Sequence, residues 1–429
     1  MNLKIEKSKV KSQKSKVEIT GSKSETNRLL LLQALYPNIT LENSSNSDDS
    51  DVMTTVLKNT KHKTQNTKLF DIHHAGTAMR FLTAFFAIQE GKEVVLTGSL
   101  RMKERPIKIL VDALVQLGAA ISYEEKEGFP PVKIRGKKLT QNKVALPANV
   151  SSQFISALLL IAPKLENGLE LLLEGEITSM PYIQMTLALL NEIGVETFFV
   201  GNKIIVKPKV TIPNSQFTIE SDWSSASYFY SIVALSEAGT QIQLSSYKQN
   251  SLQGDSVLAE IYKSFGVETL FNNDNSITIS KTNNSQVTTH TRAKGELSEA
   301  NLQLNDSPDI AQTIAVTCFG LGVGCQLTGL HTLKIKETDR LEALKTELSK
   351  LGAVIAVTND SLILEPSSAD FVMASNEAIA TYQDHRMAMA FAPLALKTNL
   401  IIEDAEVVSK SYPMFWEDMK KIGFQIEKK

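Results

Sequence analysis

The sequence predicts an α/β protein in which about six repeated units divide between two large domains. A chain of 429 residues is longer than one hydrophobic core ordinarily organises, which favours two domains. A second observation is a recurring pattern, in which a helix-like segment ends at a glycine and a strand-like segment comes next. Consecutive glycines of this pattern lie 71 to 86 residues apart. The copies are Leu117-Gly118-Ala119, Ile193-Gly194-Val195, Phe265-Gly266-Val267, Leu351-Gly352-Ala353 and Ile422-Gly423-Phe424.

Each glycine of the pattern is expected directly after a helix, where the backbone turns to positive φ and glycine is least strained. The preceding helices are amphipathic: Leu110 and Leu114 share one face, as do Leu344 and Leu348. One period before the first copy the chain reaches Asn59, and asparagine is the next best residue at such a cap. We therefore expect a sixth, degraded copy there. A regular repeat on this scale is typical of duplicated α/β subdomains.

Composition and charge exclude several classes of protein. Hydrophobic residues make up 42% of the chain and charged residues 21%, which is a globular profile. The net charge of −2 gives no basic field for nucleic acid or an anionic membrane, so neither partner is expected. Phe154–Pro163 is among the longest apolar runs and is too short to span a bilayer. The N-terminus lacks the apolar stretch of a signal peptide, so we expect a cytoplasmic protein.

No metal or nucleotide motif is present in the sequence. Its two cysteines, Cys318 and Cys325, lie in an apolar stretch and are expected to be buried free thiols. No CxxC or HxxxH pattern occurs, which leaves a zinc site without support. Neither GxxxxGK[ST] nor GxGxxG occurs. We therefore expect no metal and no cofactor.

Polar residues gather where apolar helices are expected to begin. Serine, threonine, aspartate and asparagine are the usual N-cap residues, so any one such start can be no more than a cap. Their repetition beside lysine and arginine favours anion binding, because helix N-termini offer unpaired N–H groups and a positive dipole end. These starts are Gly21–Ser24, His74–Thr77, Asn149–Gln153, Asp222–Ser225 and Asn305–Asp309.

Basic residues cluster at five points. Lys23 and Ser24 stand at a helix entrance, with Arg28 one turn later, in a pattern suited to a phosphate or carboxylate. Within another cluster, Glu337 is open to two interpretations: a surface ion pair, or a general acid with a tuned pKa. The clusters are Gly21–Arg28, Arg101–Pro106, Lys336–Arg340, Asp384–Met389 and Ser409–Pro413.

Together these pieces resemble the 3-phosphoshikimate 1-carboxyvinyltransferase (EPSP synthase) family of enolpyruvyl transferases. The matching stretches keep the family's order over nearly the whole chain, and such an ordered set is far more specific than any one motif. They are Gly21–Arg28, Asp48-Asp49, Ala75–Arg80, Arg101–Pro106, Ser151–Gln153, Pro181-Tyr182, Ser224–Tyr228, Gln253–Asp255, Pro308-Asp309, Lys336–Arg340, Asp384–Met389 and Lys410.

The resemblance implies a particular form of the α/β fold. Enolpyruvyl transferases have two similar domains, each an inside-out α/β barrel of three βαβαββ units, with the substrates in the cleft between the domains. Residues 20–221 would form the N-terminal domain, on the shikimate 3-phosphate side. Residues 1–19 and 222–429 would form the C-terminal domain, with the phosphoenolpyruvate side and the catalytic acids.

The resemblance also implies the reaction. The 5-hydroxyl of shikimate 3-phosphate adds to C2 of phosphoenolpyruvate while C3 is protonated, and the tetrahedral intermediate then loses phosphate. The product belongs to chorismate and aromatic amino acid biosynthesis, and the inhibitor glyphosate competes near Gly76. No cofactor, metal or covalent enzyme intermediate is implied, and a monomer is expected.

The same resemblance implies a role for each matching site residue. Asp309 would be the base at the 5-hydroxyl and Glu337 the proton donor to C3, with Lys23 assisting. Shikimate 3-phosphate would be held by Lys23, Ser24, Arg28, Ser151, Ser152, Gln153, Ser179, Asp309 and Lys336. Phosphoenolpyruvate would be held by Lys23, Gly76, Arg105, Gln153, Arg340, Arg386 and Lys410. Further candidates are Tyr182, His385, Thr332 and His74.

Three positions depart from the family pattern. His74 replaces the usual asparagine before Ala-Gly-Thr, which affects a contact on the phosphoenolpyruvate side. Phe81 stands where many relatives have proline, close to Gly76. Thr332 replaces an asparagine that often touches the shikimate ligand.

Three alternative functions fit the sequence less well. UDP-N-acetylglucosamine enolpyruvyltransferases share the fold but usually use a cysteine in the first half of the chain, and here no cysteine precedes Cys318. An RNA 3′-phosphate cyclase fits neither the net charge nor the two basic motifs around Arg105 and Arg340. A non-catalytic anion-binding homologue would gain nothing from Asp309 and Glu337 in its pocket.

Overall fold

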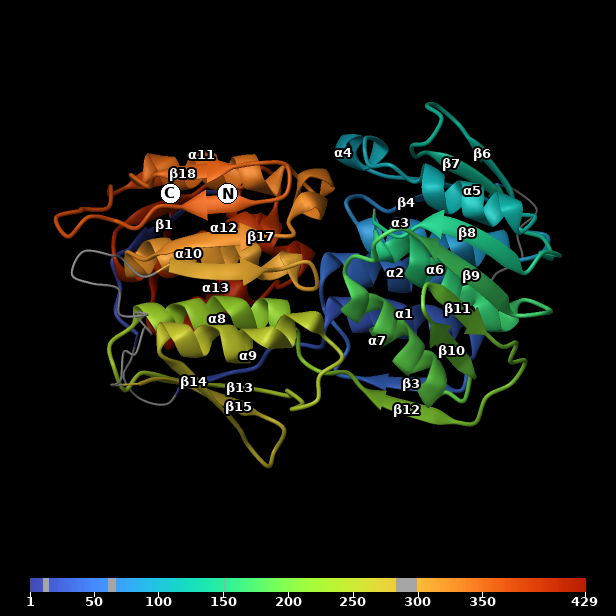
Figure 1. Cartoon of the computed structure of the whole chain (residues 1–429), viewed down its shortest axis with the longest axis horizontal. Coiled ribbons are helices and arrows are strands. Elements are labelled where there is room, and N and C mark those ends of the chain that lie inside the picture. Colours follow the sequence, from blue (N-terminus) through green and yellow to red (C-terminus); the bar gives the residue numbers. More distant parts are fainter. Residues whose placement is uncertain (11–14, 61–66, 150, 283–298) are drawn as a thin grey trace. The chain divides into compact units, whose positions relative to one another are not determined.

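The chain forms two compact units in a computed structural model that describes residues 1–10, 15–60, 67–149, 151–282 and 299–429 (Figure 1). The terminal unit combines Met1–Thr20 with Glu220–Lys429, and the inserted unit is Gly21–Ile219. The chain thus passes between the units at Thr20/Gly21 and at Ile219/Glu220.

Helices and strands alternate along the inserted unit. Its elements are α1 (Lys23–Leu35), β3 (Ile39–Glu42), α2 (Asp48–Asn59), β4 (Lys68–Asp71), α3 (Gly76–Ala87), β5 (Glu93–Thr97), α4 (Leu100–Lys103), α5 (Lys108–Gln116), β6 (Ala120–Tyr123), β7 (Val132–Arg135), β8 (Lys143–Pro147), α6 (Ser152–Ile161), η1 (Ala162–Lys164), β9 (Leu169–Glu174), α7 (Met180–Glu192), β10 (Thr197–Val200), β11 (Lys203–Val206) and β12 (Ser215–Thr218).

The terminal unit has the same alternation. Its elements are β1 (Leu3–Glu6), β2 (Ser15–Val17), α8 (Trp223–Leu235), β13 (Gln241–Leu244), η2 (Gly254–Val257), α9 (Leu258–Ile261), η3 (Tyr262–Phe265), β14 (Val267–Phe271), β15 (Ile277–Lys281), β16 (Glu299–Gln303), η4 (Pro308–Ile310), α10 (Ala311–Leu321), β17 (Gly324–Thr328), η5 (His331–Ile335), α11 (Arg340–Lys350), β18 (Ile355–Val357), β19 (Leu362–Leu364), β20 (Glu377–Ile379), α12 (His385–Phe391), η6 (Ala392–Leu396), β21 (Leu400–Ile402), η7 (Ala405–Lys410), α13 (Phe415–Ile422) and β22 (Gln425–Lys428).

A βαβαββ unit recurs with one sheet topology, as the fold class predicted. In the order β4-β5-β7-β6 the first pair is parallel and the next two pairs are antiparallel. The orders β8-β9-β11-β10 and β16-β17-β19-β18 repeat it. Two further sheets borrow strands from the chain start: β2 lies parallel to β13, and β1 lies between β21 and β22. These pairings tie the N-terminal segment into the terminal unit.

The degraded sixth copy differs from its prediction. Within the described residues its sheet has two strands, β12 and β3, which pair in parallel. Asn59 does not occupy a left-handed cap: it is the last residue of α2, and Thr60 after it has right-handed helical φ and ψ. The asparagine analogy with the glycines was therefore wrong, because the helix does not end there in the left-handed turn that the glycines provide.

The five repeat glycines do adopt positive φ, as predicted. A side chain is strained in this conformation, so each glycine allows the chain to leave a helix and enter a strand a few residues later. Their φ angles are 104° at Gly118, 81° at Gly194, 74° at Gly266, 98° at Gly352 and 120° at Gly423.

Helices form the core of each unit and sheets lie toward the outside. All twelve residues of α3 are buried, as are twelve of the thirteen residues of α8. The strands instead carry exposed apolar side chains, such as Leu69, Val200 and Leu270. A helix that is apolar on every side must be surrounded by protein. In the inserted unit α1, α3 and α6 contact one another, and in the terminal unit α8, α10 and α12 do so. No helix in the described ranges is long and apolar enough to cross a membrane.

Candidate functional site

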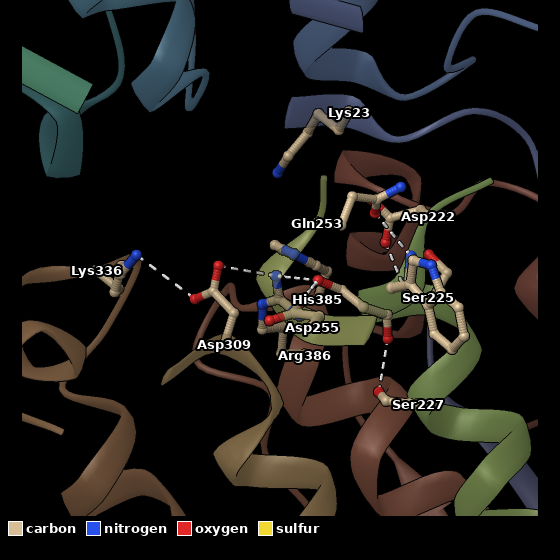
Figure 2. Close-up of polar contacts among 12 residues, drawn as sticks. Lys23, Asp222, Ser225, Ser227, Gln253, Asp255, Asp309, Lys336, His385 and Arg386 are labelled. Atoms are coloured by element: carbon tan, nitrogen blue, oxygen red, sulfur yellow. Dashed lines mark hydrogen bonds and ion pairs between the residues drawn. The ribbon is translucent and has the colours of Figure 1, made fainter. Parts of the chain in front are cut away.

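Three cations converge on Asp309 in the terminal unit. Asp309 lies in η4, directly before α10, and its Oδ1 lies 2.9 Å from Nη1 of Arg340 and 3.5 Å from Nζ of Lys336. Its Oδ2 lies 3.2 Å from Nη2 of Arg386. Figure 2 shows Asp309 between Lys336 and Arg386. The motifs around residues 309, 336–340 and 384–389 thus meet at one carboxylate. We call Asp309 and the cations around it the Asp309 cluster.

Arg340 organises the buried side of this cluster. Its side chain is 2% exposed and contacts three carboxylates. Nε lies 2.7 Å from Oδ2 of Asp384, and Nη2 lies 2.8 Å from Oε2 of Glu337. Arg340 is the first residue of α11, and Asp339 caps that helix by accepting from two backbone N–H groups. Glu337 is therefore held by the same guanidinium as Asp309, and its ion pair with Arg340 is largely buried rather than at the surface.

The turn before α12 supplies the other cation of the cluster. Asp384 is fully buried and caps α12 by accepting from the backbone N–H of Arg386 at 2.9 Å. The two residues before it, Tyr382 and Gln383, both have positive φ. Lys410 donates from Nζ to the carbonyl of Gln383 at 2.7 Å. The structure thus brings Lys410 to the turn that leads into α12, the helix on which Arg386 lies.

The charges of this cluster act strongly on Asp309. Burial alone would raise the pKa of its carboxyl, but Arg386, Lys336 and Arg340 outweigh burial and hold that pKa well below its usual range. Asp309 is therefore an ionised carboxylate in the ligand-free protein. Cations that a carboxylate already neutralises in part can exchange that partner for the phosphate or carboxylate of a ligand.

Asp255 and Ser224 belong to this cluster, although neither was among the predicted site residues. Asp255 lies in η2 and is 3% exposed. Its Oδ2 accepts a hydrogen bond from the hydroxyl of Ser224, and that hydroxyl accepts from Nη2 of Arg386 at 3.3 Å. Burial raises the pKa of Asp255 to about 7, and the charge of Asp309 adds to the rise. The signal available was that both residues fall in the matching stretches Ser224–Tyr228 and Gln253–Asp255.

His385 and Thr332, two further candidates in the terminal unit, are both buried. His385 is 2% exposed, and its Nδ1 lies 3.8 Å from Oδ1 of Asp384. Thr332 is buried in η5, and within the described residues its hydroxyl has no hydrogen-bond partner. The threonine that replaces the family's asparagine is thus compatible with a ligand contact but is not committed to a protein one.

Lys23 and Arg28 lie on α1 in the inserted unit. Lys23 is the first residue of the helix, and its Nζ lies 3.6 Å from Oδ2 of Asp49. The guanidinium of Arg28 is buried, and within the described residues it makes four hydrogen bonds and no ion pair. Its acceptors are the hydroxyls of Thr186 and Ser156 and the carbonyls of Ser24 and Tyr182.

Burial lowers the pKa of Arg28 to about 10, because the charged form is poorly solvated. The rings of Phe81 and Tyr182 lie 5.5 and 5.7 Å from its guanidinium carbon. Phe81, one of the departures from the family pattern, therefore contacts Arg28 through its aromatic face, which partly replaces solvent around the charge. Four of the five N–H donors of Arg28 go to protein atoms, so this residue positions neighbouring groups at least as much as it can contact a ligand.

Arg105 lies against Gly76 at the start of α3. A Cβ on Gly76 would come within 2.6 Å of Nη1 of Arg105, so a larger residue here would displace this guanidinium. Arg80 holds both segments, because it donates to the carbonyl of Gly76 at 3.1 Å and to the carbonyl of Pro106 at 3.0 Å. Arg80 was not among the predicted site residues. Its spacing of four residues from Gly76 was the available signal.

The other two cations of the Arg101–Pro106 motif are surface residues. Arg101 pairs with Glu104 at 3.2 Å, and Lys103 pairs with Glu125 at 2.6 Å. Only Arg105 among the three is buried. The dense positive charge of this motif thus reduces to one inward-facing guanidinium.

The remaining predicted residues of the inserted unit lie at helix starts. Ser151 caps α6, and Gln153 donates from Nε2 to the hydroxyl of Thr77 on α3 at 3.2 Å. Ser152 is the buried first residue of α6. Ser179, with φ of 55°, precedes α7. His74 lies 2.9 Å from the hydroxyl of Ser99 through Nδ1.

The arrangement as a whole suits anionic ligands. In each unit, polar helix starts that are far apart in sequence contact one another, and lysine or arginine stands among them. Within the described residues no group of three or more His, Cys, Asp or Glu side chains could hold a metal ion. The two predicted acids both contact the guanidinium of Arg340, an arrangement suited to acid–base chemistry beside a bound anion.

Comparisons with known proteins identify the family. The family model for EPSP synthase (3-phosphoshikimate 1-carboxyvinyltransferase) matches residues 7–419. A 3-phosphoshikimate 1-carboxyvinyltransferase of Bacteroides fragilis (strain YCH46) is 44% identical over 419 residues, covering 96% of each chain. One from Actinobacillus pleuropneumoniae serotype 5b is 35% identical over 439 residues, covering 95% of this chain and 96% of its own. The structure of EPSP synthase from Acinetobacter baumannii matches the fold over 100% of both chains, with a TM-score of 0.75 and 21% identity.

Proposed function

The chain belongs to the EPSP synthase family, and we propose that it transfers the carboxyvinyl group of phosphoenolpyruvate to the 5-hydroxyl of shikimate 3-phosphate, with release of phosphate. The 44% identity over nearly the full length of a curated relative supports this function over that of a UDP-N-acetylglucosamine enolpyruvyltransferase. The reaction is a step of chorismate and aromatic amino acid biosynthesis.

The convergence of Lys336, Arg340 and Arg386 on Asp309 is the observation that carries this proposal. Each substrate bears a phosphate and a carboxylate, so the reaction needs several cations that remain charged and fixed. A pure anion-binding protein would be weakened by two carboxylates among its cations. The presence of Asp309 and Glu337 on the same guanidinium therefore favours catalysis over binding alone.

We assign the phosphoenolpyruvate contacts of the terminal unit to Arg340, Arg386 and Lys410, and those of the inserted unit to Lys23, Gly76, Arg105 and Gln153. In support, the guanidinium of Arg105 lies against Gly76, and Lys410 donates to Gln383 in the turn that leads into α12. A cation that already has such a contact loses less conformational freedom when it binds an anion, which supports this assignment. Shikimate 3-phosphate would be held by Lys23, Ser24, Arg28, Ser151, Ser152, Gln153, Ser179 and Lys336, with Tyr182 beside it.

In the proposed mechanism Asp309 accepts the proton of the 5-hydroxyl as that oxygen bonds to C2. Glu337 donates a proton to C3, and the C2–C3 double bond is lost in the tetrahedral intermediate. In the second half the Glu337 carboxylate takes a proton back from C3, the double bond forms again, and the C2–O bond to phosphate breaks. The proton held by Asp309 passes to the departing phosphate. Lys23 and the arginines stabilise the negative charge that moves onto the departing phosphate.

The direct test is release of inorganic phosphate by the purified full chain. Phosphate should appear only when shikimate 3-phosphate and phosphoenolpyruvate are both present, and the enolpyruvyl ether of shikimate 3-phosphate should appear in equal amount. Turnover with UDP-N-acetylglucosamine in place of shikimate 3-phosphate would reject the proposal.

The roles of the two acids have their own test. Asp309→Asn and Glu337→Gln keep the side-chain shapes, so turnover should fall by about 10²-fold or more while substrate binding is largely retained. Asp370→Asn, at an exposed aspartate of the same unit, serves as the matched control. Lost binding at unchanged turnover would assign both acids to ligand positioning instead.

The same full chain is proposed to act as a monomer and to be inhibited by glyphosate in competition with phosphoenolpyruvate. Light scattering at assay concentration measures the first property. An inhibition curve at several phosphoenolpyruvate concentrations measures the second, and inhibition that phosphoenolpyruvate does not relieve would argue against a shared site at Gly76.

A further inference from the structure

Asp255 is a buried carboxyl group that the catalytic scheme does not use. Its side chain is 3% exposed, and it lies in the same cluster as Asp309 and Arg386 (Figure 2). One oxygen, Oδ2, accepts from the hydroxyl of Ser224. Within the described residues the other oxygen, Oδ1, is buried without a hydrogen-bond partner. An ionised carboxylate would normally hold several donors in such a place, because an unsatisfied buried charge is very costly.

The charged groups around Asp255 disfavour its ionised form. Asp309 and Asp222 are both acidic neighbours, and Arg386 is the cation that opposes them. Arg386 itself is shared, since it lies 3.2 Å from Asp309 and also donates to the hydroxyl of Ser224, which in turn donates to Asp255. On the elements that pack against η2, α8 contributes no charged side chain and α9 contributes the exposed Glu260, which pairs with Lys263.

We propose that Asp255 carries a proton in the anion-binding form of the protein, and that it acts as a positioning residue which couples the hold of Arg386 on phosphoenolpyruvate to the uptake of that proton. This inference rests on the proposed function for the identity of the anion. Asp255 and Ser224 together form a neutral bridge to Arg386. As a neutral acid, Asp255 leaves the positive charge of Arg386 available to the incoming anion, and as a carboxylate it competes for that charge.

The coupling has a definite sign. The pKa of Asp255 is about 7 in the ligand-free protein, where burial and Asp309 raise it and Arg386 opposes them. An anion bound to Arg386 partly neutralises the positive charge that lowers the pKa of Asp255, and it adds negative charge nearby. Anion binding must therefore raise the pKa of Asp255 further. By linkage, anion binding then takes up a proton, and affinity falls as the pH rises through the ligand-free pKa. The fall is at most tenfold per pH unit for one proton.

The expected kinetic result is a KM for phosphoenolpyruvate that rises between pH 7 and pH 9, by up to about tenfold per unit, while kcat changes much less. The second ionisation of a phosphate ester has a pKa of about 6, so the substrate itself does not titrate in this range. Asp255→Asn imitates the protonated acid and should give a low KM that no longer rises with pH. Asp255→Ala removes the bridge to Ser224 and should raise KM at every pH. Asp370→Asn is the matched control and should behave like the unmodified protein.

A KM profile in Asp255→Asn that rises as in the unmodified protein would overturn the proposal. So would an Asp255→Asn variant whose KM is high at every pH, since that would show that the ionised form is the one that binds.

A second measurement does not depend on turnover or on the stability of a variant. Infrared spectroscopy of the ligand-free full chain should show a protonated-carboxyl band that disappears as the pH is raised through about 7. The same band should be missing from Asp255→Asn. If the unmodified protein shows no such band, Asp255 is ionised and the inference fails. If the band is present but phosphoenolpyruvate and shikimate 3-phosphate give no turnover, the proposed function fails while the assignment of the proton stands.

Discussion

Replacing Asp384 by asparagine should destabilise the terminal unit by about 3 kcal/mol. Asp384 and Arg340 form an ion pair whose side chains are 0% and 2% exposed, with Nε and Oδ2 separated by 2.7 Å. Removing one partner of a buried pair typically costs about 3–5 kcal/mol, because the remaining charge is left in a poorly solvating environment. Arg340 also contacts Asp309 and Glu337, which places this substitution at the low end of the range.

Asparagine is chosen because it changes the charge and little else. Asp384 also caps α12 by accepting from the N–H of Arg386, and asparagine caps helices about as well as aspartate does. Asp384→Ala loses the cap as well and should cost about 1 kcal/mol more. The difference between the two variants therefore separates the cap from the ion pair.

Urea unfolding monitored by tryptophan fluorescence measures this effect in the right unit. The chain has two tryptophans, Trp223 and Trp416, and both lie in the terminal unit. Asp370→Asn, at an exposed site of that unit, provides the control for a generic loss of one negative charge. If Asp384→Asn lies within about 0.5 kcal/mol of that control, the attraction in this pair does no more than balance its desolvation, and the reasoning is refuted.

Three other substitutions test neighbouring features. Tyr382→Phe removes the 2.6 Å hydrogen bond to the buried Glu347, which anchors the positive-φ turn before Asp384. KM for phosphoenolpyruvate should rise up to about tenfold, with a smaller effect on kcat. An unchanged KM would show that the turn keeps its conformation without this bond. Gly76→Ala places a Cβ 2.6 Å from Nη1 of Arg105 and should weaken phosphoenolpyruvate binding more than shikimate 3-phosphate binding. Equilibrium titration of each ligand measures the two affinities. Equal losses of affinity for both ligands would indicate a general disturbance of α3. Asp255→Asn should stabilise the protein at pH 8 but hardly at pH 4. A carboxyl whose pKa rises from 3.8 to about 7 on folding lowers the free energy of unfolding progressively as the pH rises through that interval, by at most about 4 kcal/mol. An equal difference in unfolding free energy between the two proteins at both pH values would contradict this.

The fold class could be predicted from the sequence because its signals are local. A glycine after an amphipathic helix specifies a left-handed residue there whatever surrounds it, and Gly118 and Gly352 both adopt it. The prediction at Asn59 failed because asparagine only tolerates that conformation. Asn59 stays helical as the last residue of α2, and Thr60 after it also has right-handed φ and ψ.

The site could be predicted only in part. Lys336, Arg340 and Arg386 were found because lysine and arginine in short motifs are visible in one dimension. Asp255, Ser224 and Arg80 were missed as site residues because their importance depends on contacts with residues far away in the chain, such as the bridge from Asp255 to Arg386. In the opposite direction, Arg101 looks like part of a basic cluster in the sequence but pairs with Glu104 at the surface.

The low pKa of Asp309 and its proposed role as a base are two consequences of one arrangement. In the ligand-free protein Arg386, Lys336 and Arg340 stabilise its carboxylate, so it is a poor proton acceptor. Phosphate and carboxylate groups that bind these cations would withdraw that stabilisation and leave a buried carboxylate near new negative charge. Its proton affinity would then rise when both substrates are present and not before. A base that becomes strong only in the complete complex fits a reaction whose acceptor hydroxyl must not be activated until phosphoenolpyruvate is in place.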